Sequence, residues 1–190
     1  MKTIIRPAIT LFAVLTVICC VVYPYVVTGI GQVAFAKEAE GSLVMVNGQP
    51  VGSSLIGQAF TSPKYFWGRP SATSPKPNDA TASSGSNLGP LNPALTDAVK
   101  GRIDALKAAD PANTAPIPVD LVTASASGLD PEISLAAAYY QVGRIARERH
   151  LGVDEVRSMI DKHRESQYLG FFGEPRVNVL ALNLDLDHAH

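Results

Sequence analysis

The sequence lacks charged side chains throughout residues 7–36, and this absence limits what its N-terminal part can be. Within that stretch, residues 8–30 are almost wholly apolar. A helix of this length covers about 35 Å, against a bilayer hydrocarbon core of roughly 30 Å. We therefore expect residues 1–36 to comprise a short cytoplasmic N-terminus and a single transmembrane helix, with tilt or a kink at Pro24 absorbing the excess length.

A cleaved signal peptide is the alternative interpretation, because Lys2 and Arg6 precede the apolar stretch and residues 34–36 (AFA) resemble an A-x-A cleavage site. The apolar core of a secretory signal is about 7 to 15 residues long, so length favours an anchor. Lys37 is the only basic residue that follows the stretch closely. The excess of basic residues before the span predicts a cytoplasmic N-terminus, a single pass through the inner membrane and an extracytoplasmic location for residues 37–190.

The exported part also lacks cysteine, because Cys19 and Cys20 both lie in the apolar stretch. Residues 37–190 therefore cannot form a disulfide within the chain, and packing or partners must stabilise them. They are numerous enough for one domain with a hydrophobic core. With 14 basic and 17 acidic residues, this part has a formal charge of about −3, which argues against nucleic-acid binding.

Catalytic motifs are missing as well. The sequence has no G-x-x-x-x-G-K-[ST] phosphate-binding loop, no G-x-S-x-G nucleophile elbow and no S-x-x-K dyad. Its four histidines show no metal-ligand spacing with a third donor. We therefore predict no catalytic residue, no cofactor-binding residue and no metal site, and the chain by itself is not expected to be an enzyme.

The remaining patterns predict an α+β domain with a small β-sheet and about three helices. Asn47-Gly48 is typical of a tight hairpin turn, and Asn92-Pro93 is a good helix start. Residues 71–93, rich in Ser, Pro, Asn and Gly, are expected to form a long loop. The expected strands are the hairpin over residues 42–52, then 119–123 and 177–186; the expected helices are residues 92–110, 131–149 and 153–164.

Residues 123–131 (TASASGLDP) alternate hydroxyl and apolar side chains. In an extended chain the hydroxyls of Thr123, Ser125 and Ser127 would share one face. Because small side chains let a partner approach the backbone closely, we interpret this segment as a docking surface. An internal strand followed by a helix-capping turn remains the alternative.

The order of longer motifs resembles the C subunit of the high-affinity potassium-transporting P-type ATPase, the Kdp complex, over almost the whole chain. The motifs lie behind the N-terminal span with its Tyr23-Pro24 pair. They are GSLV (41–44), LIGQAF (55–60), YFWGRPSAT (65–73), SGSNL (84–88), NP (92–93), VDLVTASASGLDPEIS (119–134), QVGRIARER (141–149) and VNVLALNLDLD (177–187). One departure is Trp67, where the family often has His, so no proton or ion role is carried over to that position.

The resemblance implies a non-catalytic accessory subunit that stabilises an ATP-driven potassium uptake complex and raises the ATP affinity of the hydrolytic subunit. The implied partners are a potassium-channel-like subunit, an ATP-hydrolysing subunit and membrane lipid. ATP and potassium would be handled by the other subunits, and this chain would bind no cofactor directly. A membrane-anchored adaptor unrelated to ion transport is the alternative. The residues proposed to bind partners are Arg69, Ser86, Asn87, Thr123, Ser125, Gly128, Asp130, Gln141 and Arg144.

Overall fold

The computed structural model describes residues 2–189, so Met1 and His190, the ends of the two expected segments, lie outside the described residues. The chain divides into two compact units, Met1–Val51 and Gly52–His190. Each unit is described by itself below.

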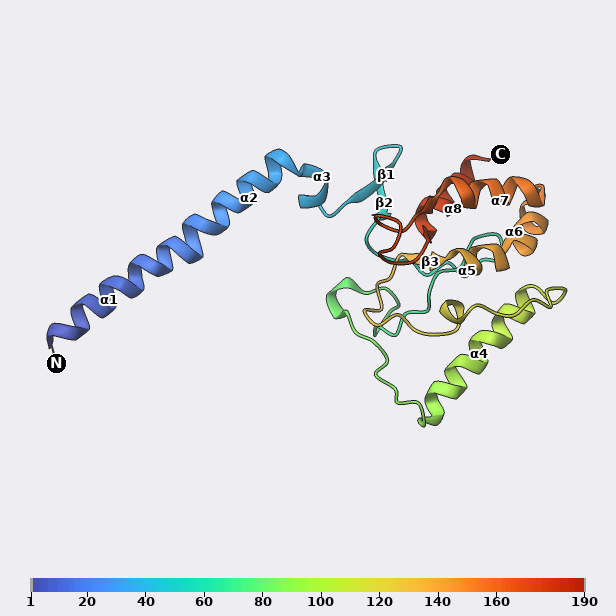
Figure 1. The fold of residues 1–190 in the computed structure, drawn as a ribbon, viewed down its shortest axis with the longest axis horizontal. Helices are drawn as coiled ribbons and strands as arrows, with labels where there is room; N and C mark the ends of the chain where they lie inside the picture. The colour runs from blue at the N-terminus through green and yellow to red at the C-terminus, as the bar shows by residue number, and fades with distance from the viewer. Residues whose placement is uncertain (1, 190) are drawn as a thin grey trace. The chain divides into compact units, whose positions relative to one another are not determined.

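The first unit begins with one long helix (Figure 1). It comprises α1 (Lys2–Thr16), a π-helical turn η1 (Val17–Val22) and α2 (Tyr23–Ala34). The Tyr23 N–H donates to the carbonyl of Ile18, five residues back, immediately before Pro24, which has no N–H to donate. Residues 3–34 are long and apolar enough to cross a membrane, with none of the tested window buried in the structure. The predicted single apolar helix is therefore confirmed.

A short helix, α3 (Ala36–Ala39), and a two-stranded hairpin, β1 (Leu43–Val46) and β2 (Gln49–Ser53), follow the long helix. Asn47 and Gly48 connect the strands with φ angles of 50° and 75°. A two-residue turn with positive φ at both positions matches the twist of a hairpin, and Asn-Gly is the pair that adopts it most easily. The predicted hairpin is thus present.

The second unit is a mixed α+β domain, as predicted. Its small sheet has the order β3-β5-β4, with antiparallel neighbours and Ile133 opposite Val177. Its strands are β3 (Glu132–Ser134), β4 (Arg164–Glu165) and β5 (Arg176–Asn178). Its helices are α4 (Pro93–Ala109), α5 (Leu135–Tyr140), α6 (Val142–Arg149), α7 (Val153–Lys162) and α8 (Val179–His188), with short 3₁₀ turns η2 (Ala80–Ala82) and η3 (Val119–Leu121).

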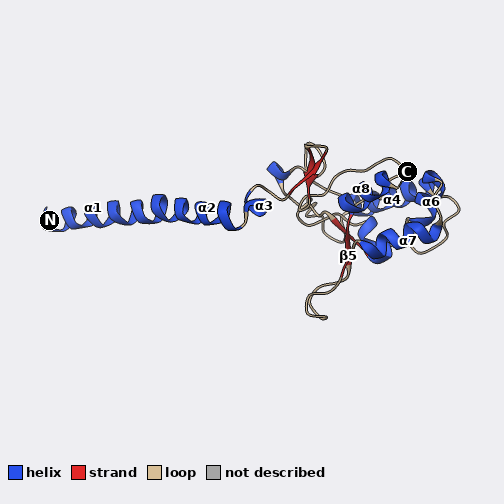
Figure 2. Cartoon of the chain, turned by 90° about the horizontal axis from the view of Figure 1, so that it is seen from above, coloured by secondary structure: helices blue, strands red, loops and turns tan. Residues whose placement is uncertain are grey.

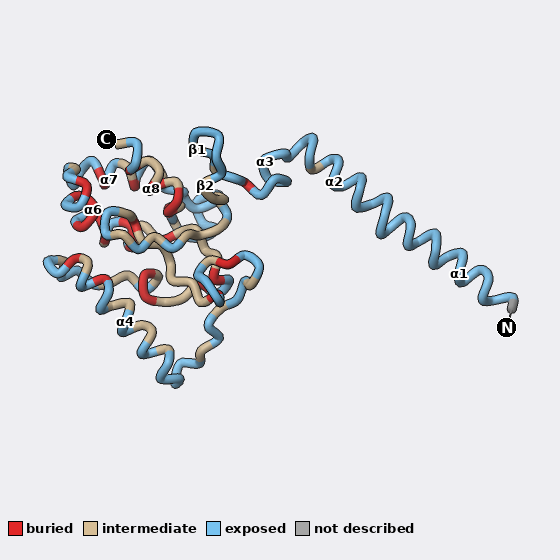
Figure 3. Tube along the Cα trace, turned by 180° about the vertical axis from the view of Figure 1, so that it is seen from behind, coloured by how far each residue is buried: buried red, intermediate tan, exposed pale blue. Residues whose placement is uncertain are grey.

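The hydrophobic core lies among α5–α8 and the sheet, as Figure 3 shows for the labelled helices α6, α7 and α8. Ile145, Val156, Ile160 and Val177 are completely buried there. Extended loops separate α4 from these helices in Figure 1, and α4 adds Leu106 to the core. The predicted loop over residues 71–93 is confirmed, interrupted only by η2 within the described chain.

The predicted strand over residues 177–186 is wrong beyond Asn178, because the chain turns there into α8. Asn178 ends β5 and also caps the helix, its Oδ1 accepting from the Ala181 N–H at 3.0 Å. The buried positions of α8 recur at helical spacing rather than alternating; they are Val179, Leu180, Leu182, Asn183 and Leu186. Because α8 is buried on two adjacent faces, its apolar residues also alternate along part of the sequence, and this alternation wrongly indicated a strand.

Two further predictions need correction. The expected helix over residues 131–149 begins only at Leu135, because residues 132–134 pair with β5 and Ser134 caps the helix. It is also interrupted at Gln141, between α5 and α6. The expected strand over residues 119–123 is instead η3 and a bend that follows it. The N–H and hydroxyl of Thr123, after the end of η3, both donate to the Val119 carbonyl.

The aromatic segment 63–67 begins in a turn, in which the Tyr65 N–H donates to the Ser62 carbonyl, and it does not belong to a β-sheet. Side chains satisfy its carbonyls. Asn183 of α8 accepts from the Phe66 N–H at 2.8 Å and donates to the Phe66 carbonyl at 3.0 Å. Gln141 does the same for Trp67, at 2.8 and 3.1 Å. Both amides therefore imitate a neighbouring strand for one residue each.

Two buried arginines of α6 complete the pairing of this segment. Arg144 donates to the carbonyls of Pro63 and Tyr65, the latter at 2.9 Å, and Arg149 donates to the Lys64 carbonyl at 2.9 Å. We call residues 63–67 the clamped segment. Phe66 is buried and Tyr65 and Trp67 are half-buried, so the backbone of these three residues depends on side chains of the domain for hydrogen-bond partners.

Asn183→Leu tests this arrangement. The substitution keeps the number and branching of the side-chain heavy atoms but leaves the Phe66 N–H and carbonyl unpaired in the core. We expect a loss of about 2 to 5 kcal/mol in the free energy of unfolding, since each buried unsatisfied group costs about 1 to 3 kcal/mol. Urea unfolding of the full chain in detergent measures it. Thr96→Leu, at an exposed position on α4, is the control and should change stability by less than about 0.5 kcal/mol; equal effects would contradict the proposed role of Asn183.

Candidate partner-binding site

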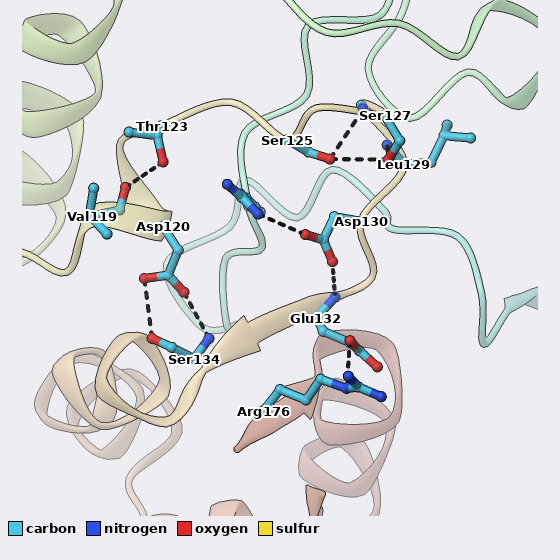
Figure 4. Close-up of polar contacts among 12 residues, drawn as sticks. Val119, Asp120, Thr123, Ser125, Ser127, Leu129, Asp130, Glu132, Ser134 and Arg176 are labelled. Carbon is cyan, nitrogen blue, oxygen red and sulfur yellow. Dashed lines mark hydrogen bonds and ion pairs between the residues drawn. The ribbon is translucent and has the colours of Figure 1, made fainter. Parts of the chain in front are cut away.

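Several of the predicted partner-binding residues meet where the loop after the clamped segment contacts residues 125–130. Ser71 Oγ donates to the Gly128 carbonyl at 2.7 Å, and the Ser125 N–H donates to the Pro70 carbonyl at 2.9 Å. Ser125 Oγ in turn accepts from the Gly128 N–H at 3.1 Å. Figure 4 shows Ser125 and Ser127 turned toward each other, with their hydroxyl oxygens 3.2 Å apart. We call this contact between residues 69–73 and 125–130 the loop junction.

Charged side chains border the loop junction. Arg69 pairs with Asp130 at 3.1 Å, and Asp130 also accepts from the Glu132 N–H. Glu132 pairs with Arg176 across β3 and β5 at 2.8 Å (Figure 4). Burial raises the pKa of the Glu132 carboxyl, an effect that the positive charge of Arg176 opposes. The arrangement fixes strand β3 to the junction and provides no free nucleophile or base.

Glycine at position 128 is required by this geometry. Its φ is +70°, and a Cβ there would lie 2.5 Å from Thr73 Cγ2 and 2.7 Å from the Ser84 carbonyl oxygen. A Cβ at position 85 would likewise lie 2.8 Å from the Ala126 carbonyl oxygen, so Gly85 also packs closely against this segment. The Ser84 N–H donates to the Ser127 carbonyl at 3.0 Å, so the loop that contains Ser86 and Asn87 is laid against the same segment.

The predicted partner-binding residues differ in their accessibility. Ser125, Gly128, Gln141 and Arg144 are buried and make contacts within the domain. Arg69, Thr123 and Asp130 are half-buried, whereas Ser86 and Asn87 are exposed. The structure brings Arg69, Ser125, Gly128 and Asp130 together at the loop junction and places Gln141 and Arg144 at the clamped segment. Surfaces available to a partner therefore include Ser86, Asn87 and the accessible parts of the half-buried residues.

Of the predicted partner-binding residues, Arg144 has the side chain whose pKa is shifted most. It is buried beneath the clamped segment, and its guanidinium lies over the Trp67 ring at 4.7 Å from the centroid. Burial lowers the pKa of Arg144 to about 10, which still leaves it charged at neutral pH. Its hydrogen bonds to backbone carbonyls indicate a packing role rather than acid-base chemistry. Among residues 2–189, no group of three or more His, Cys, Asp or Glu side chains could hold a metal ion.

Sequence reasoning missed an exposed apolar surface in the loop before β5. Tyr168, Leu169, Phe171 and Phe172 are 56 to 74% exposed, and Tyr168 and Phe172 form an isolated antiparallel bridge. Figure 2 shows this loop projecting from the domain. We call residues 168–172 the aromatic tip. The sequence signal was the run of large apolar residues beside Gly170 and Gly173, but only the structure shows that nothing in the described domain covers them.

Gly128→Ala tests whether the loop junction depends on this glycine. We expect a loss of more than about 1 kcal/mol in the free energy of unfolding, because the added methyl group is forced into positive φ and against Thr73 and Ser84. Gly101→Ala is the matched control on α4, where a Cβ meets nothing within 4 Å. That change should stabilise the helix by up to about 1 kcal/mol. Thermal unfolding of the two full-length variants measures both effects, and a neutral Gly128→Ala would contradict the prediction.

Comparison with known proteins agrees with these features. The model of the family described as "K+-transporting ATPase, c chain" (KdpC) matches residues 5–188. The potassium-transporting ATPase KdpC subunit of Herminiimonas arsenicoxydans is 74% identical over 190 residues, with both chains covered completely. Its counterparts from Janthinobacterium sp. (strain Marseille) and Dechloromonas aromatica are 72% and 63% identical over 187 residues, 98% of this chain and 99% and 98% of theirs. The chain therefore belongs to the KdpC family, the C chains of potassium-transporting ATPases.

Proposed function

We propose that the chain is a non-catalytic accessory subunit of an ATP-driven potassium uptake complex and that it stabilises the assembly. The observation that carries this proposal is the family match, which extends from residue 5 to residue 188 and so includes both the apolar helix and the domain. The geometry is consistent with it. The polar side chains at the clamped segment and the loop junction bond mainly to groups within the domain.

The proposed partners are a potassium-channel-like subunit and an ATP-hydrolysing subunit, together with membrane lipid around the apolar helix. ATP and potassium are handled by those subunits, and this chain binds no cofactor directly. An effect on the ATP affinity of the hydrolytic subunit requires coupling through the membrane-embedded parts, because the domain lies outside the cytoplasm in the proposed topology. The support for that topology is the position of Lys2 and Arg6 before the span.

Protease accessibility tests the proposed orientation. In spheroplasts that contain the full complex, protease added outside should digest residues 37–190 and leave an epitope at the N-terminus protected. Full protection of the domain would show that the orientation is opposite to the one proposed. A mature chain that begins at Lys37, identified by N-terminal sequencing, would instead show a cleaved signal peptide.

The aromatic tip is the surface that we propose for docking onto a partner subunit. Aromatic side chains are enriched at the energetic centres of protein interfaces, and a projecting tip can enter a partner's pocket without rearrangement of the domain. Ser86, Asn87 and Thr123 remain additional candidates on the loop side, together with the accessible parts of Arg69 and Asp130. The buried residues Ser125, Gly128, Gln141 and Arg144 would support these surfaces from within.

The double substitution Phe171→Ser and Phe172→Ser tests this docking surface. It should reduce recovery of the other subunits with the tagged full chain by at least about tenfold, because two interface aromatics typically contribute more than 1.4 kcal/mol. Thermal unfolding of the variant chain should be nearly unchanged, since both rings are exposed.

Leu91→Ser is the matched control for the tip variant, because Leu91 is a 96% exposed apolar residue in a different loop. Its recovery of partners should equal that of the unaltered chain. Normal recovery with the tip variant would reject the tip as a docking surface. Failure of the unaltered chain to recover any potassium-transporting subunit would reject the proposed function and favour an unrelated adaptor.

A further inference from the structure

A pocket of about 380 Å³ lies in the second unit, between α4, residues 58–61 and residues 67–71. Its walls are mainly apolar, with Phe60, Trp67, Leu106 and Leu121 among them. Pockets of this size accommodate small organic molecules. Trp67 of the clamped segment and Arg69 of the loop junction line it, but the roles described above for these residues do not explain an open pocket.

Arg102 gives the pocket an uncompensated positive charge. Its Nη1 donates to the Val122 carbonyl at 2.8 Å, which fixes the guanidinium at the pocket wall. No carboxylate within residues 2–189 forms an ion pair with it at 4.0 Å or less. Partial burial lowers the pKa of Arg102, which indicates that the charge is poorly solvated.

Arg69 also lines the pocket and retains an unused donor. Its Nη1 pairs with Asp130, but its Nε is buried and has no hydrogen-bond partner in the described part of the chain. An unsatisfied buried donor is unfavourable, and a ligand's acceptor could relieve that cost only if the side chains around Arg69 move to admit it. No Asp or Glu side chain is among the residues that line this pocket.

We propose that this pocket binds a small organic anion with an apolar body, such as an aromatic or branched carboxylate. The carboxylate pairs with Arg102, and the apolar body lies against apolar wall residues that include Trp67 and Leu106. A charge-assisted hydrogen bond to Arg102 favours an anion over a neutral compound. A very small anion binds weakly, because it makes little contact with the apolar walls. This inference does not depend on which subunits the chain assembles with.

The probe is 4-(trifluoromethyl)benzoate, followed by fluorine NMR with the full chain in lipid nanodiscs. Its neutral counterpart, 4-(trifluoromethyl)benzyl alcohol, tests the need for charge, and trifluoroacetate tests the need for an apolar body. Empty nanodiscs correct for partition into lipid. Because Trp67 is the only tryptophan and lines the pocket, its fluorescence reports whether the probe binds there. We expect saturable binding of the benzoate, at least about tenfold tighter than binding of either comparison compound.

Three variants locate the interaction. Arg102→Gln should weaken benzoate binding at least about tenfold while leaving the weak binding of the alcohol unchanged. Ala105→Phe should reduce binding of both compounds, because Ala105 lines the pocket and the larger side chain fills it. Lys107→Gln, which removes an exposed charge on the same helix outside the pocket, should bind as the unaltered chain does.

Several results would overturn the proposal. They are the absence of saturable binding, equal affinity for the benzoate and the alcohol, and binding that leaves Trp67 fluorescence unchanged or survives Ala105→Phe. Thermal unfolding checks that each variant is folded. If Arg102→Gln unfolds because the Val122 contact is lost, the comparison of the charged and neutral compounds on the unaltered chain decides the question.

Discussion

Five successive carbonyl groups, those of residues 63–67, accept hydrogen bonds from side chains instead of from a neighbouring strand. The donors are Arg144 and Arg149 of α6, Asn183 of α8 and Gln141 at the break between α5 and α6. In a β-sheet, neighbouring strands on the two sides would supply such bonds, each to alternate residues. Here side chains of the helices supply the bonds instead, so the segment can run from the surface at Pro63 to the buried Phe66 with its carbonyls paired.

The side chains that hold the clamped segment also connect it to the surrounding helices. Gln141 bonds the backbone of Trp67 and also lies at the point where α5 gives way to α6. Arg149 pairs with Asp187 at 2.7 Å and lies over the Tyr65 ring, which joins α6 to the end of α8. The clamped segment then leads directly to Arg69 and the loop junction, so the position of the segment fixes where the pocket and the junction form.

The division between buried polar groups and exposed apolar ones is consistent with an accessory subunit of the potassium-transporting ATPase family. The buried amides and guanidinium groups are used for folding, and burial lowers the pKa of the Arg144 guanidinium by desolvation. The exposed aromatic tip, by contrast, has no evident packing role within its own domain. An exposed cluster of large aromatic side chains is typical of a surface that another molecule covers.

By itself the sequence determined the features that depend on neighbouring residues. The uncharged residues 7–36 specified a long apolar helix, Asn47-Gly48 a hairpin turn, and Asn92-Pro93 the start of α4, since length, positive φ and capping are local properties. The order of longer motifs also identified the family correctly. Only the tertiary structure decided that Phe66 and Trp67 are held by Asn183 and Gln141, which are 117 and 74 residues away. It also decided that α8 is a helix, because that choice rests on which faces of residues 179–186 are buried against distant elements, and alternation in sequence cannot reveal those neighbours.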